Sequence, residues 1–187
     1  MTDESHRDSK PAIRDAASDP NPWKALRAFT AARIGLPRSG ASLATKPLLE
    51  FKLAHARARD AVHAPFDDAR LQADLGALGV PVLLVASAAD DRQHFLMRPD
   101  LGRRLAADGL AELAAHAGKY DVAFVVSDGL SAVAVQNHAQ PVLAQLLPLL
   151  RSEGWRIAPI TVVRRGRVAI GDAVAAALDA DIVVVLI

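Results

Sequence analysis

Apolar runs alternate with amphipathic stretches along the second half of the chain. Residues 122–126, 157–163 and 182–187 are nearly continuous apolar runs rich in valine and isoleucine, which is typical of strands buried on both faces. Residues 140–151 and 170–178 place their apolar side chains at helical spacing. Strands separated by helices predict an α/β fold with a Rossmann-like, doubly wound, mostly parallel sheet.

Prolines modify this pattern at three positions. Pro141 lies near the start of the predicted helix 140–151, and Pro148 is expected to bend or end it, because proline removes a helical hydrogen bond. Pro159 argues against a central place in the sheet for residues 157–163, because proline cannot donate to a neighbouring strand.

The first half of the chain is predicted to be mainly helical. Residues 1–22 are polar and charged and are expected to form a disordered leader. Residues 23–80 are expected to form an N-terminal helical segment, with a loop at residues 33–44 and Pro47 in the first turn of the helix that follows. Residues 81–187 are then the Rossmann-like domain.

This second domain is expected to begin with a hairpin. Residues 82–87 and 93–97 flank a short polar turn, which predicts two antiparallel strands. Residues 98–100 are then expected to open a long helix. The side chains predicted to face inward from that helix are Leu101, Leu105, Leu110 and Leu113.

Composition narrows the classes of protein that fit. The chain has 187 residues, of which 51% are hydrophobic, enough to build the core of one domain with a tail. A formal net charge of +1 argues against a dedicated nucleic-acid binder. The absence of cysteine excludes disulfides and thiolate metal sites. No signal peptide and no apolar run of about 20 residues occur, so a cytoplasmic protein without a membrane span is expected.

An arginine-rich turn is the main candidate for ligand binding. Arg164, Arg165 and Arg167 flank Gly166, after a predicted strand and before a predicted helix. Open α/β sheets bind ligands at this end of a strand. The alternative is an ordinary solvated turn.

Residues 127–131 (Ser-Asp-Gly-Leu-Ser) form a second such turn, after the strand 122–126. The glycine in it would let backbone N–H groups approach a ligand. The alternative is a plain turn into a helix, capped by Asp128 or Ser131.

The sequence contains no independent catalytic or metal-binding motif. The dinucleotide fingerprint, the phosphate-binding loop and the zinc-protease signature are all absent. His55, Arg59 and His63 share one helical face, which could bind a metal or an anionic partner but more simply forms a solvated or subunit-contacting surface. We therefore predict neither catalytic residues nor metal ligands in this chain.

Five stretches, taken in order, resemble the small (light-chain) subunit of ethanolamine ammonia-lyase. The motifs of residues 98–105 (Arg-Pro-Asp-Leu-Gly-Arg-Arg-Leu) and 127–131 weigh most. The resemblance covers roughly residues 26–187. The other three stretches are residues 30–34, 53–62 and 163–168.

The resemblance implies an activity shared between two chains. The family enzyme uses adenosylcobalamin to convert ethanolamine to acetaldehyde and ammonia by radical chemistry. Its substrate site lies in a large TIM-barrel subunit, and the small subunit helps to hold the cobalamin at the interface. The expected partner is therefore that large subunit, in a hetero-oligomer that is cytoplasmic or enclosed in a bacterial microcompartment.

The resemblance also supplies candidate cofactor-binding residues. Val168 matches a family cobalamin contact, and Arg167 beside it is suited to the amide side chains of the corrin because a guanidinium carries several donors. Asp128 and Gly129 are further candidates, placed by the expected topology. Arg164 and Arg165 are expected to be structural or to face the partner.

Two departures from the family pattern lead to an alternative. In the family the last strand is followed by a Gly-Glu-Arg-Pro-Gly contact segment and later by a cysteine-containing one, whereas this sequence ends at Ile187. Pro37 replaces a usual glycine before Arg38. We expect a C-terminally truncated subunit with an incomplete cobalamin site. The alternative is a non-enzymatic Rossmann-like interaction protein that has lost cofactor binding.

Overall fold

The computed structural model describes Trp23 and residues 25–187, so the predicted leader 1–22 lies outside the described residues. The chain divides into two compact units, Met1–Leu53 and Ala54–Ile187. Within the described residues, no helix is both long and apolar enough to cross a membrane.

The first unit differs in part from the prediction of two helices joined by a loop. Among its described residues, the first helical element is a single 3-10 turn, η2 (Ala25–Ala28). The predicted loop contains a small antiparallel hairpin of β1 (Arg38–Ser39) and β2 (Ser42–Leu43). Gly40 turns this hairpin with a φ of 60°, a conformation that glycine adopts without strain. Helix α1 (Thr45–His63) follows with Pro47 in its first turn, as predicted, and none of its side chains is buried.

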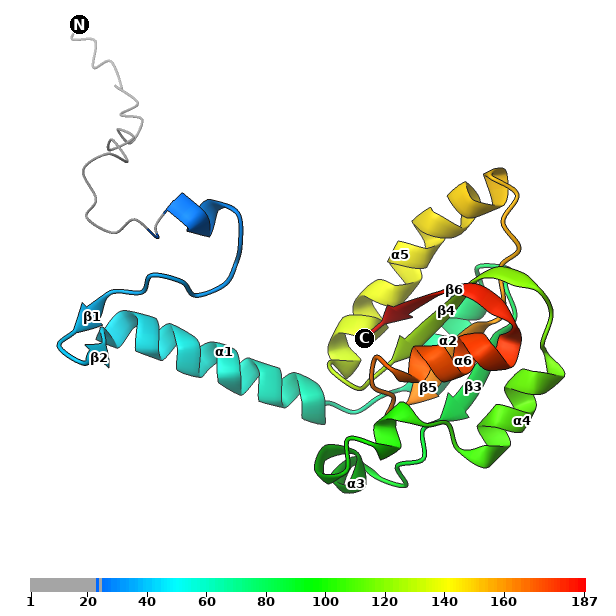
Figure 1. Cartoon of the computed structure of the whole chain (residues 1–187), viewed down its shortest axis with the longest axis horizontal. Coiled ribbons are helices and arrows are strands. Elements are labelled where there is room, and N and C mark those ends of the chain that lie inside the picture. Colours follow the sequence, from blue (N-terminus) through cyan, green and yellow to red (C-terminus); the bar gives the residue numbers. More distant parts are fainter. Residues whose placement is uncertain (1–22, 24) are drawn as a thin grey trace, which may run out of the picture. The chain divides into compact units, whose positions relative to one another are not determined.

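The second unit is built on a four-stranded parallel sheet (Figure 1). Its strands are β3 (Val82–Ala86), β4 (Tyr120–Ser127), β5 (Ile160–Arg164) and β6 (Ala180–Leu186). Their order across the sheet is β3-β5-β4-β6, and every pairing is parallel. The predicted α/β class with a parallel sheet is confirmed.

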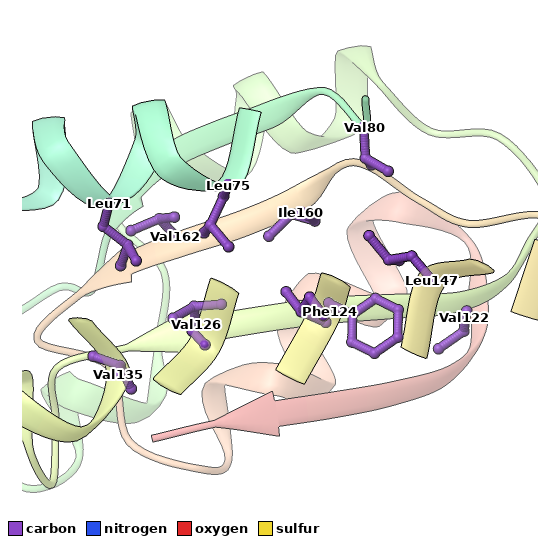
Figure 2. Packing of buried hydrophobic residues seen from close by; sticks show 12 residues of the cluster. Leu71, Leu75, Val80, Val122, Phe124, Val126, Val135, Leu147, Ile160 and Val162 are labelled. Carbon is purple, nitrogen blue, oxygen red and sulfur yellow. The ribbon is translucent and has the colours of Figure 1, made fainter. Parts of the chain in front are cut away.

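One face of the sheet is covered by α2 (Asp68–Gly76) and α5 (Ala132–Ser152). Phe124 of β4 lies at the centre of this layer and is fully buried, with helix residues such as Leu75 and Leu147 packed around the same cluster (Figure 2). Alternate residues of β4 point to this face because side chains along a strand alternate between its two sides.

The other face is covered by α4 (Ala107–Ala115) and α6 (Ile170–Leu178). Ala123 and Val125 of β4 point to this side and are completely buried. Small side chains on the helix allow close packing here: a Cβ added at Gly171 of α6 would lie 2.6 Å from a methyl group of Val185. Burial on both faces explains why residues 122–126 of β4, a central strand, are continuously apolar.

The predicted hairpin after β3 is wrong. Residues 93–97 form most of a short helix, α3 (Arg92–Met97), rather than a second strand. Asp91 begins this helix by accepting the backbone N–H of His94 at 2.8 Å, which satisfies a donor that a helix start leaves free. Phe95 is the buried residue of α3. A helix this short buries a single apolar side chain and has no periodic apolar face. Its sequence therefore resembles that of a short strand.

The predicted long helix from residue 98 is also wrong. A 3-10 turn, η3 (Leu101–Arg103), is separated from α4 by residues that run antiparallel to the end of β3. The N–H of Ala106 donates to the carbonyl of Ala86 at 3.0 Å, so the sheet edge competes with helix formation. The side chains predicted to face inward also differ in part: Leu113 is buried as expected, whereas Leu110 is 49% exposed.

Helix α5 begins eight residues earlier than predicted and continues through both of its prolines. Ser131 caps it by accepting the N–H of Ala134 at 3.0 Å. An internal proline costs about 3 kcal/mol, and this cost is offset by tertiary packing of one helical face on the sheet. The buried residues of that face are Ala132, Val135, Ala139, Leu143 and Leu147.

Strand β5 is central, contrary to the expectation drawn from Pro159. The strand begins at Ile160, so the proline precedes its first paired residue and removes no ladder hydrogen bond.

Acid sensitivity is expected from an ion pair at the start of β4. Asp121 accepts the backbone N–H of Arg156 at 2.6 Å and its Nη2 at 2.8 Å. These hydrogen bonds, the side-chain one foremost, lower the pKa of Asp121 to about 2 from 3.8. Because the folded-state pKa is the lower one, the stabilisation is complete above pH 3.8 and is lost as the pH falls toward 2.

We therefore predict that Asp121→Asn lowers the free energy of unfolding at pH 7, and that its difference from the unmodified chain shrinks by pH 2. Urea unfolding at the two pH values measures this. Glu112→Gln, at an exposed position of α4, is the control and should leave the pH dependence unchanged. An Asp121→Asn deficit of equal size at both pH values would contradict the assignment.

Candidate functional site

The turns that follow β4 and β5 meet at one edge of the sheet, because these strands are neighbours and parallel. Between the turns lies a cavity of about 470 Å³. It is lined by Arg103, Gly129, Leu130, Arg167, Val168, Ala169, Asp172 and Ile187. Three of the four predicted cofactor-binding residues, Gly129, Arg167 and Val168, are therefore brought together.

The two turns are joined by close backbone contacts. The hydroxyl of Ser127 accepts the N–H of Gly166 at 3.0 Å and lies 2.8 Å from the carbonyl oxygen of Val163, to which it donates. Gly129 approaches Gly166 so closely that an added Cβ would collide with the Gly166 carbonyl oxygen. Gly129 is needed because only a residue without a Cβ permits this approach, and a Cβ at Gly166 would lie 2.8 Å from the Ser127 hydroxyl oxygen.

Asp128, the fourth predicted residue, does not line the cavity. It is 4% exposed, and its carboxylate accepts the N–H of Arg165 at 2.5 Å. The other oxygen pairs with Arg92 at 3.1 Å. Buried carboxylates require such partners, and these two link the β4 turn to α3 and to the β5 turn. Asp128 thus holds together the turns that form the cavity wall without lining the cavity itself.

Arg164 and Arg165 are both engaged within the chain. The guanidinium of Arg164 pairs with Asp68 of α2, which raises the pKa of that arginine further. Arg165 has a left-handed backbone, with φ of 57°, and its Nε donates to the Ala89 carbonyl at 2.7 Å. Their structural role, expected from the sequence, fits these contacts.

Arg167 reaches back from the cavity onto α3. Its guanidinium lies over the ring of Phe95, 4.6 Å from the centroid, and its Nη2 donates to the Phe95 carbonyl at 3.0 Å. Its backbone N–H donates to Gly102 at 2.7 Å. Among the described residues, its buried Nε has no hydrogen-bond partner. Val168 beside it is 60% exposed and presents an apolar surface.

Sequence reasoning missed several residues of this site. Arg103 and Asp172 supply charge to the lining, and Phe95 supports Arg167 from α3. Arg103 belongs to the motif of residues 98–105 and could have been proposed from it. Phe95 carried no such signal, because its contact with Arg167 joins residues 72 apart.

A second cavity, of about 530 Å³, lies in the first unit. It is lined by Trp23, Arg33, Ile34, Gly35, Leu36, Arg38 and Leu43. None of the predicted cofactor-binding residues belongs to it. Within the described residues, no cluster of three or more histidines and carboxylates could hold a metal ion, so the histidines of α1 do not form one.

The cavity between the turns lies within the part of the chain that matches a known family. The family model described as "Ethanolamine ammonia-lyase light chain (EutC)" matches residues 20–187.

Curated relatives carry the same description. A protein of Ralstonia nicotianae, named ethanolamine ammonia-lyase small subunit, is 53% identical over 191 residues, covering 100% of this chain and 68% of its own length. Proteins of the same name from Azotobacter vinelandii and Pseudomonas fluorescens are 53% and 50% identical, over 89% of this chain and 63% and 62% of their lengths. The chain therefore spans 62% to 68% of these relatives. The chain belongs to the ethanolamine ammonia-lyase small-subunit family.

Proposed function

We propose that this chain is the small subunit of an adenosylcobalamin-dependent ethanolamine ammonia-lyase. In this proposal the cavity between the β4 and β5 turns holds one edge of the cobalamin at the interface with a large TIM-barrel subunit. The observation that carries it is the convergence of Gly129, Arg167 and Val168 on one cavity. The Rossmann-like character of the sheet is part of the same proposal, supported by parallel strands covered on both faces.

The chemistry of the lining fits the cofactor. Corrin rims carry amide groups, which both donate and accept hydrogen bonds, around an apolar ring. Arg103 and Arg167 offer donors and Asp172 an acceptor. The apolar lining residues, Leu130, Val168 and Ile187, match the ring itself.

The size of the cavity supports a shared site. A volume of about 470 Å³ is in the range that encloses an ordinary small molecule. Cobalamin is far larger, so this cavity can enclose only part of it. The remaining surface of the cofactor would then be covered by the large subunit, which is why we place the site at an interface.

The proposed division of labour leaves no proton-transfer role to this chain. When bound, the cofactor supplies the radical chemistry that converts ethanolamine to acetaldehyde and ammonia. The chain's own residues bind and orient one edge of the corrin and exclude water from it. Catalytic residues are proposed to lie in the large subunit.

The contacts of the arginine-rich turn argue against nucleic-acid binding. The guanidinium of Arg164 pairs with Asp68, and that of Arg165 donates to the Ala89 carbonyl. Nucleic-acid binders instead present guanidinium groups toward solvent with aromatic residues between them.

Cobalamin titration of the complex with the large subunit tests the proposal. Arg167→Met, which keeps the apolar stem and removes the donors, is expected to weaken cyanocobalamin binding about tenfold. Absorbance titration measures the dissociation constant. Arg98→Met is the matched control, because Arg98 is 60% exposed, pairs with Asp100 and does not line the cavity.

Two outcomes would count against the proposal. A complex that forms but binds no cobalamin would favour the alternative of a non-enzymatic interaction protein. Failure of this chain to restore ammonia release from ethanolamine to the large subunit would contradict the assignment as its small subunit.

A further inference from the structure

We infer that Phe95 is a positioning residue for the cobalamin site, holding the guanidinium of Arg167 in its binding orientation. The inference rests on the proposed function and adds a residue that does not itself line the cavity. Its basis is the way in which Arg167 is held from behind by α3.

Phe95 fixes Arg167 through two separate contacts. The ring face lies 4.6 Å from the guanidinium carbon, and the Phe95 carbonyl accepts Nη2 at 3.0 Å. A cation over a ring face is attracted by the ring quadrupole, most strongly where water is excluded. Phe95 is 1% exposed, so this contact is shielded from solvent.

Gly102 packs closely against both the Phe95 ring and the side chain of Arg167. A Cβ at Gly102 would lie 2.9 Å from the Phe95 ring and 3.0 Å from Cγ of Arg167. The Gly102 carbonyl accepts the Arg167 backbone N–H at 2.7 Å. Arg167 is thus confined at its backbone, its stem and its guanidinium.

The same ring connects Arg167 to the opposite wall of the cavity. Arg92 also lies over Phe95, 5.4 Å from the centroid, and pairs with buried Asp128 next to Gly129. The Phe95 ring therefore contacts two guanidinium groups, that of Arg167 in the β5 turn and that of Arg92, which pairs with Asp128 of the β4 turn. A long arginine side chain loses rotamer entropy when it binds a ligand, and prior confinement removes part of that cost.

The test compares two equally buried phenylalanines in the complex with the large subunit. Phe95→Leu removes the ring beneath Arg167, whereas Phe124→Leu makes the same change in a fully buried residue of β4, in the core between the sheet and helices α2 and α5. Cyanocobalamin binding is measured by absorbance titration, and folding by thermal unfolding. We expect Phe95→Leu to weaken binding about tenfold and Phe124→Leu to leave it within about twofold, although both lower the melting temperature.

A double-mutant cycle separates positioning from general destabilisation. In an Arg167→Met background, Phe95→Leu is expected to cause no further loss of affinity, because the group that it positions is gone. Unchanged affinity of Phe95→Leu, or an equal loss in both backgrounds, would overturn this inference alone. An unmodified complex that does not bind cyanocobalamin would overturn the proposed function, and this inference with it.

Discussion

Gly129→Ala is expected to lower the free energy of unfolding by about 3 kcal/mol and to abolish cobalamin binding. The added Cβ would collide with the carbonyl oxygen of Gly166 and crowd Ile187, at 3.1 Å. A backbone carbonyl in a buried turn cannot rotate away as a flexible side chain can. The β4 and β5 turns must therefore separate, which breaks the contacts between Ser127 and Gly166 and opens the cavity.

Gly76→Ala is the matched control for this substitution. Gly76 is the last residue of α2, and an added Cβ there meets no atom within 4 Å. Alanine has the higher helix propensity, so stability should stay the same or rise slightly. Urea unfolding and cyanocobalamin titration measure both variants. A Gly129→Ala chain as stable as Gly76→Ala would show that the two turns are not in contact.

Asp128→Ala is expected to lower the free energy of unfolding by about 3 kcal/mol. The substitution leaves Arg92 and the N–H of Arg165 without their carboxylate partner, and breaking a buried pair costs more than losing an exposed one. The expected loss lies at the lower end of the usual range because the Arg92 side chain is 25% exposed.

Asp100→Ala tests whether the loss of stability in Asp128→Ala comes from the burial of the ion pair or from its charge alone. Asp100 also pairs with arginines, Arg98 at 2.9 Å and Arg104 at 3.4 Å, but its side chain is 38% exposed. Exposed pairs contribute little, so this variant should lose far less stability than Asp128→Ala in the same denaturation experiment. Equal losses would mean that Asp128 does not organise the site.

Long buried elements could be predicted from the sequence because their signal is local. The parallel strands β4 and β6 are continuous apolar runs, and α6 has a clean helical period over the range Ile170–Leu178. In β4, burial on both faces leaves no polar position to obscure the pattern over residues 122–126. The convergence of Gly129 and Val168 then follows from adjacent parallel strands.

The region between β3 and α4 could not be predicted in the same way. There a single aspartate cap at Asp91 and one buried side chain, Phe95, decide the structure, and neither produces a periodic pattern. The inward orientation of Asp128 likewise depends on Arg92 and Arg165, which are distant in sequence. Contacts of this kind are specified by the tertiary fold and leave no local signature.

A structure of this chain with its large subunit and bound cyanocobalamin tests the central claim most directly. We predict that one edge of the corrin lies against Gly129 and Val168, with the Arg167 guanidinium within hydrogen-bonding distance of a corrin amide and still stacked on Phe95. A corrin that contacts neither the β4 turn nor the β5 turn would contradict the claim.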